Sequence, residues 1–119
     1  MGEKAGAFTV DDHFAGKSPQ IRKVYERLLE LLEKIGPVSE DPKKTSIHLV
    51  RESALAGVEV RGEYLLLNLK TDYPIKSPRV ERAERLSANR YHSKVRLSAI
   101  AEVDGEVKRW LKDAYSLSG

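Results

Sequence analysis

The apolar residues of this chain change their spacing twice, and that change constrains the fold more than any other feature. Between residues 21 and 35 they recur every three or four positions, at Ile21, Val24, Tyr25, Leu28, Leu31, Leu32 and Ile35. This spacing is typical of an amphipathic helix with one buried face. Ser18 followed by Pro19 predicts where the helix starts. Gly36 predicts where it ends.

The middle of the chain alternates apolar and polar residues with a period of two, which is typical of strands with one buried face. The apolar positions are Ile47, Leu49, Val58, Val60, Leu65, Leu67, Leu69, Val95 and Leu97. Gly62 marks a tight hairpin connection within this region. The segment 79–86, RVERAERL, fits a short helix as well as a strand. We predict a strand, because a strand there can pair with the segment that follows.

A second helical spacing closes the sequence, at Ile100, Val103, Val107, Trp110, Leu111, Ala114 and Tyr115. Trp110 and Tyr115 are therefore predicted to lie in the core. The order of helix, strands and helix predicts an α+β fold. We expect a two-layer sandwich, with the N- and C-terminal helices on one face of a mainly antiparallel sheet of about five strands. A chain of 119 residues fits one domain. We place that domain at residues 8–117, after a flexible segment 1–7.

Composition excludes several classes of protein. The chain has no cysteine, which rules out disulfides, zinc sites built on thiolates and cysteine nucleophiles. It has no apolar run long enough for a signal peptide or a membrane-spanning helix. We therefore expect a soluble, cytoplasmic protein without a membrane partner. Because no phosphate-binding loop, serine elbow or dinucleotide-binding glycine pattern occurs, an enzyme is disfavoured and no cofactor is predicted.

The histidines include the right chemistry for a metal ion but lack the right spacing. His13, His48 and His92 are far apart in the sequence. A pair at i, i+3 or i, i+4 would place two ligands on one helix face, and none is present. We therefore predict no metal site.

Positive charge gathers in the middle of the chain. Residues 43–96 hold 12 Lys or Arg against 6 Asp or Glu, whereas the flanks together carry a net −3. If Ile47, Leu49 and Val95 face the helices, the alternating residues face the other way. This outward face is then basic and carries two of the histidines. Lysine and arginine supply the charge that a phosphate needs. The candidate ligand-binding residues are Lys43, Lys44, His48, His92, Lys94 and Arg96.

These residues favour a non-catalytic binding or accessory domain for an anionic ligand, which could be a nucleotide, phosphate or nucleic acid. Two alternatives stay open. In the first, the exposed face is charged only because it is solvated and because charge discourages edge pairing. In the second, the domain is a protein–protein interaction module or a homodimer that acts through its sheet, with no small-molecule ligand.

Three segments carry a resemblance to a known family. They are FTVDDHFAGKSPQIRKVYERLLELL, PKKTSIHLVRESALAGVEVRGEYLLLNL and RYHSKVRLSAIAEVDGEVKRWLKDAY, and they extend over nearly all of residues 8–115. Together they resemble a bacterial family of uncharacterised domains of unknown function. The resemblance implies a domain found alone or at the C-terminus of predicted transport proteins, some of them nuclease-like. More loosely, the ending WLKDAY is similar to the MmcQ/YjbR-like proteins, which implies a frataxin-like fold of helix, about five strands and helix.

Overall fold

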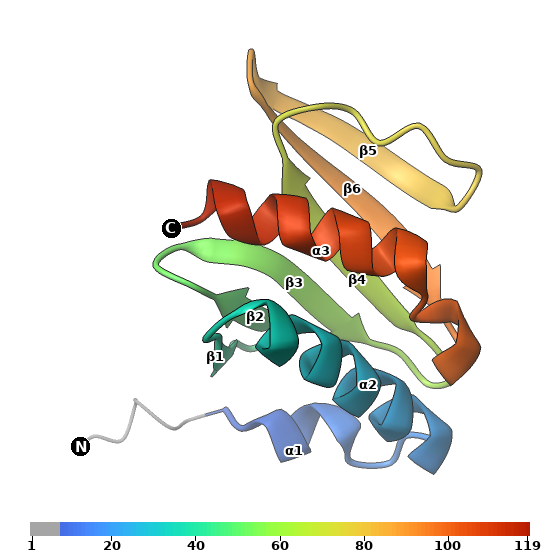
Figure 1. Ribbon diagram of the computed structural model, residues 1–119. Coiled ribbons are helices and arrows are strands. Elements are labelled where there is room, and N and C mark those ends of the chain that lie inside the picture. The colour runs from blue at the N-terminus through green and yellow to red at the C-terminus, as the bar shows by residue number, and fades with distance from the viewer. Residues whose placement is uncertain (1–7) are drawn as a thin grey trace.

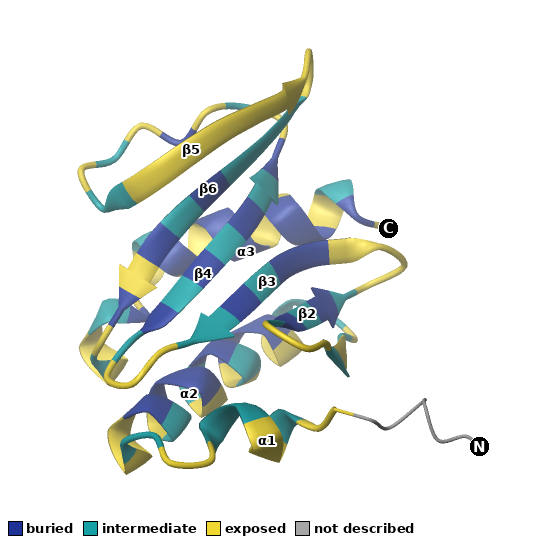
Figure 2. Cartoon of the chain, turned by 180° about the vertical axis from the view of Figure 1, so that it is seen from behind, coloured by how far each residue is buried: buried dark blue, intermediate teal, exposed yellow. Residues whose placement is uncertain are grey.

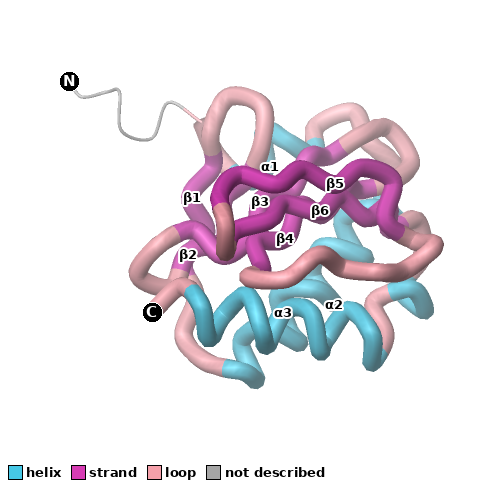
Figure 3. Tube along the Cα trace, turned by 90° about the horizontal axis from the view of Figure 1, so that it is seen from above, coloured by secondary structure: helices cyan, strands magenta, loops and turns pink. Residues whose placement is uncertain are grey.

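Two long helices cover one face of an antiparallel sheet of six strands, and the other face of the sheet is bare (Figures 1 and 3). The structure is a computed structural model that describes residues 8–119. The segment 1–7, expected to be flexible, lies outside the described residues. The helices are α1 (Val10–Phe14), α2 (Pro19–Ile35) and α3 (Gly105–Leu117), with a short 3-10 turn, η1 (Ile100–Glu102), before α3. The strands are β1 (Ser39–Pro42), β2 (Ile47–Val50), β3 (Ala54–Val60), β4 (Leu65–Thr71), β5 (Val80–Ser87) and β6 (Arg90–Leu97).

The predicted α+β fold is therefore confirmed, with one strand more than expected. Strand β1, residues 39–42, has no apolar alternation of its own and was not predicted. It is a strand because it pairs antiparallel with β2, with Ser39 opposite Val50 and Pro42 opposite Ile47. The segment predicted as a strand in preference to a helix is β5, which pairs with β6.

Capping side chains fix where the helices begin. The Ser18 hydroxyl accepts a hydrogen bond from the backbone N–H of Gln20, and Gly36 is the C-cap of α2, as the sequence predicted. The start of the last helix differs from the expected one. The Asp104 side chain accepts the N–H of Val107, so α3 begins at Gly105 and Ile100 lies in the turn before it. A side chain that satisfies a free N–H is a strong start signal, which explains the shift.

The core lies between the helices and the inner face of the sheet. Leu28 of α2, Leu111 of α3 and Leu67 of β4 are all fully buried in it. Trp110 and Tyr115 are also buried, as predicted. No helix among residues 8–119 is long and apolar enough to cross a membrane.

Arg79 fastens the connection between β4 and β5 to the start of α3. Its guanidinium donates to both carboxylate oxygens of Asp104, at 3.1 and 3.2 Å, and to Glu106 at 3.1 Å. It also donates to the backbone carbonyl of Glu102 at 2.8 Å and lies over the ring of Trp110. The side chain is only 23% exposed. Its partners Asp104 and Glu106 are 45% and 38% exposed, so water screens the ion pairs in part.

Ser93 is an anomaly on the inner face of β6. It is 0% exposed, and its Oγ has no hydrogen-bond partner among the described residues. A buried hydroxyl without a partner costs about 1–3 kcal/mol. We therefore expect Ser93→Ala to raise the free energy of unfolding by about 1 kcal/mol, measured by urea denaturation.

The matched control for this prediction is Ser118→Ala. Ser118 is also buried, but its Oγ donates to the carbonyl of Ala114 at 2.8 Å. Removing that hydrogen bond should lower the free energy of unfolding. A loss of stability in Ser93→Ala as large as in Ser118→Ala would contradict the prediction.

Candidate functional site

Two neighbouring rows of side chains cross the outer face of the sheet, the face without helices. The first row joins directly paired residues of β2, β3, β4 and β6: His48, Gly57, Asn68 and Lys94. The second row joins β4, β6 and β5: Lys70, His92 and Glu84. Period two along each strand places all of them on the same face.

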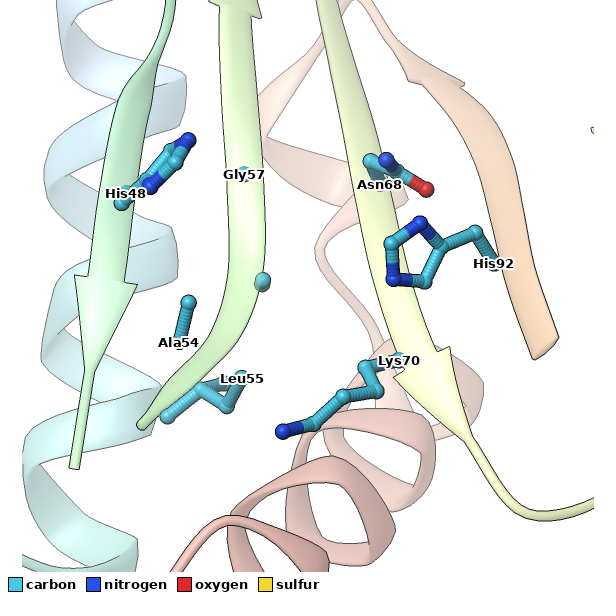
Figure 4. A pocket seen from close by; sticks show the side chains of 8 residues that line it. His48, Ala54, Leu55, Gly57, Asn68, Lys70 and His92 are labelled. Atoms are coloured by element: carbon cyan, nitrogen blue, oxygen red, sulfur yellow. The ribbon is translucent and has the colours of Figure 1, made fainter. Parts of the chain in front are cut away.

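A hollow of about 110 Å³ lies between these two rows and is lined by residues of both. Figure 4 shows the ring of His48 at one side and that of His92 at the other, with Gly57 on the strand between them and the Lys70 side chain below both rings. The lining residues are His48, Ala54, Leu55, Ala56, Gly57, Asn68, Lys70 and His92. Gly57 opens the floor because it has no side chain. A Cβ there would approach only the His48 ring, at 3.8 Å.

Asn68 connects this hollow to a smaller one beside it. The second hollow is lined by Asn68, Arg82, Glu84, His92 and Lys94. The Oδ1 of Asn68 is buried and has no hydrogen-bond partner among the described residues. Buried polar atoms are nearly always paired with protein, water or ligand. The amide oxygen of Asn68 can therefore accept a hydrogen bond from a donor such as water, whereas an anion could bind only the NH2 group of the same amide.

The two titratable groups beside Asn68 have shifted pKa values. Burial lowers the pKa of His92 below its usual 6.5, and Lys70 adds to the effect, whereas Glu84 opposes it. Burial also lowers the pKa of Lys70, helped by Arg90. In both cases the positive form has lost hydration, and a bound anion would restore favourable interactions to it.

The structure places the predicted residues in different parts of the face. His48 and His92, far apart in the sequence, line the same hollow. Lys94 lies in the smaller neighbouring hollow. Lys43 and Lys44 follow β1 in the turn before β2 and line neither hollow.

Carboxylates neutralise much of the positive charge that was predicted for this face. The ammonium of Lys94 lies 2.9 Å from Glu59. The guanidinium of Arg96 lies 2.8 Å from Glu81 and over the ring of Tyr64. In the turn, Lys43 pairs with Asp41 at 3.0 Å. The outer face is therefore mixed in charge, whereas the sequence predicted a basic face.

Sequence reasoning missed Gly57, Asn68 and Lys70. A signal for two of them was present, because the buried positions Leu67 and Leu69 alternate with Asn68 and Lys70. The same period that assigned the leucines to the core assigns these two side chains to the opposite face. No sequence pattern identified Gly57, because a glycine opens a hollow only together with the side chains of the neighbouring strands.

His13 lies apart from the other two histidines. Its ring Nε2 is 2.7 Å from the backbone carbonyl of Lys43, a contact that ties α1 to the turn after β1. Within residues 8–119, no group of three or more His, Asp and Glu side chains is arranged to hold a metal ion.

Comparison with known proteins gives one result at the level of the family. Searches of curated proteins and of solved structures found no match. A family model described as "Domain of unknown function (DUF5655)" matches residues 10–118, which include every helix and strand described above. The chain therefore belongs to the DUF5655 family.

Proposed function

We propose that this domain binds a small anion of the phosphate class in the hollow between His48 and His92, as a non-catalytic binding or accessory module. One observation carries the proposal. Two histidines and a lysine, from three different strands, line one hollow that Gly57 leaves open. Each of these side chains can donate a hydrogen bond to a phosphate oxygen.

The size of the hollow favours a small ligand. Sites for drug-sized molecules have volumes of roughly 300–1,000 Å³. The hollow here is about 110 Å³. This volume suits a free phosphate, or the terminal phosphate of a larger molecule whose remainder lies outside.

Lys70 is the main cation of the site because it is the one lysine or arginine among the described residues that line the hollow. Among the described residues Lys70 has no carboxylate partner, and its ammonium contacts only the Ser53 hydroxyl, at 3.1 Å. Lys94 and Arg96 each have a carboxylate partner. A nucleic acid would need positive charge continued along the face. The carboxylates of Glu59 and Glu81 interrupt it, so a compact anion is favoured.

Binding should depend on pH through His92. A bound anion favours the imidazolium, whereas burial in the free protein disfavours it. Affinity should therefore rise as the pH falls through the pKa of His92, which lies below about 6.5. Sulfate is the suitable probe, because its own charge is constant over this range.

The test is a titration with inorganic phosphate at low ionic strength, followed by the NMR signals of the histidine rings and backbone amides. We expect His48, Asn68, Lys70 and His92 to shift in the wild type. Asn68→Asp should weaken binding by about tenfold or more, because it adds a carboxylate of nearly the same shape to the floor of the hollow.

The chain offers a matched control. Asn89, its only other asparagine, lies in the exposed turn between β5 and β6. Asn89→Asp adds the same charge outside the hollow and should leave the affinity within about twofold. If phosphate shifts none of the four residues, or if the two variants weaken binding equally, the proposal is wrong. Binding of a single-stranded oligonucleotide that Asn68→Asp leaves unchanged would also contradict it.

We also propose a cytoplasmic location, because phosphate compounds are abundant in the cytoplasm. The resemblance to MmcQ/YjbR-like proteins, and the occurrence of the domain at the C-terminus of predicted transport proteins, stay predictions.

A further inference from the structure

Strand β5 is an edge strand with one free side. The strand order is β1-β2-β3-β4-β6-β5, so β5 pairs only with β6. Every residue from Glu81 to Ser87 is exposed, which the yellow strand in Figure 2 shows. Among the described residues, no backbone hydrogen bond connects this stretch to any segment except β6. Unpaired N–H and C=O groups along an edge are a template for another strand.

The two edges of the sheet differ in how well they are protected. At the other edge, β1 has four residues and ends in Pro42. Short length and proline both discourage strand addition. Strand β5 has eight residues and contains no proline. It also carries Leu86, a large apolar side chain that is 51% exposed.

The sequence of β5 is complementary to itself when read antiparallel. In a two-fold pairing of identical strands, the axis must pass through one residue position so that opposite side chains share a face. An axis at Ala83 sets Arg82 of each copy opposite Glu84 of the other. An axis at Arg82, Glu84 or Arg85 would set like charges against each other. Of these positions, only an axis at Ala83 places opposite charges across the junction.

The structure orients these side chains for such a pairing. Arg82 lies opposite Lys94 and Glu84 opposite His92, so both point to the outer face, whereas Ala83 lies opposite Ser93. Irregularities in the ladder fall between Val80 and Arg82 and between Arg85 and Ser87, so residues 82–85 form the regular part. Neither Arg82 nor Glu84 makes an ion pair with another described residue. Their charges are available to a second copy.

We propose that two copies of this chain pair through β5, antiparallel, about a two-fold axis at Ala83. The six strands of each copy then form one continuous sheet with the outer faces on the same side. Two Arg82–Glu84 pairs cross the junction, and Leu86 lies at the level of Val80 of the second copy. The smaller hollow, which Arg82 and Glu84 line, is then completed at the junction. This pairing does not require an anion in the hollow between His48 and His92, although the smaller hollow adjoins it.

The first test is the mass in solution, measured by sedimentation velocity over a range of concentrations. The wild type should form a dimer as concentration rises. Arg82→Glu and Glu84→Arg should each weaken that dimer by about tenfold or more, because each sets like charges opposite each other twice. An equimolar mixture of the two variants should form a heterodimer, because one copy then carries carboxylates at both positions and the other carries arginines at both. The double variant Arg82→Glu/Glu84→Arg should also dimerise again.

The second test uses the absence of native cysteine. Directly opposite residues in an antiparallel pair have Cα atoms about 4.5–5.5 Å apart, within the range for a disulfide. Ala83→Cys should therefore cross-link two copies under mild oxidation. Ser87→Cys, on the same exposed strand but far from its equivalent in this register, should not. A wild type that stays monomeric at the highest concentration, a mixture that forms no heterodimer, or equal cross-linking at both positions would each overturn the proposal.

Discussion

Leu111→Ala should lower the free energy of unfolding by about 3 kcal/mol, because it leaves a cavity at the centre of the core. Leu111 is fully buried in α3, the helix that packs on β3 and β4 and against α2. Those strands also hold Gly57, Asn68 and Lys70 on their outer face. Because α3 packs on the sheet and on α2, the variant should still unfold in one cooperative transition. Urea denaturation then measures the lowered free energy of unfolding.

Lys112→Ala is the control for this change. Lys112 is the next residue of α3 and is exposed, so its truncation removes no core contact. We expect a change within about 0.5 kcal/mol. Equal losses for Leu111→Ala and Lys112→Ala would show that α3 does not pack on the sheet as described.

Arg79→Met should lower the free energy of unfolding at pH 7 by about 1.5 kcal/mol, because the hydrogen bonds of Arg79 to two partly exposed carboxylates and a backbone carbonyl are lost. The methionine keeps most of the apolar stem but cannot bind Asp104, Glu106 or the carbonyl of Glu102. The connection between β4 and β5 would then lose its attachment to α3.

The effect of Arg79→Met should depend on pH. Partial burial alone would raise the pKa of Asp104, but the N–H of Val107 and the guanidinium of Arg79 outweigh it and hold the pKa below its usual value. A carboxyl with a lowered folded-state pKa adds stability above its unfolded pKa of about 3.9, and this stability disappears as the pH falls through the folded pKa. The difference between wild type and variant should therefore shrink below about pH 4.

Urea denaturation at pH 7 and pH 3 measures both quantities. Arg109→Met is the matched control, since Arg109 is exposed on α3 and forms no ion pair among the described residues. It should change the free energy of unfolding by less than about 0.5 kcal/mol at either pH. A difference between wild type and Arg79→Met that is as large at pH 3 as at pH 7 would rule out the carboxylates as its cause.

Local sequence patterns were sufficient for most of the fold. The three-to-four spacing of apolar residues predicted α2 and α3, and the caps Ser18 and Gly36 fixed the ends of α2. Strand β1 could not be predicted in this way, because nothing in residues 39–42 favours a strand. Its hydrogen-bond partner is β2, and only the folded sheet brings the two together.

The candidate site was less predictable than the fold. Alternation along β2 and β6 assigned His48 and His92 to one face. Whether they share a hollow depends on the strand order, in which β3 and β4 lie between them. Local periodicity does not encode strand order. For the same reason, the ion pairs that join Glu59 to Lys94 and Glu81 to Arg96 could not be read from either partner alone.

Gly57 lowers the stability of the sheet and leaves space open on its outer face. It lies on a central strand, where glycine is about 0.5–1 kcal/mol less stable than alanine. Its φ is not positive, and an added Cβ would meet the His48 ring only at an ordinary van der Waals distance. Packing among the described residues therefore does not require a glycine there. The sheet therefore lacks stability that a single methyl group would restore, and the outer face keeps open the space that such a methyl group would occupy.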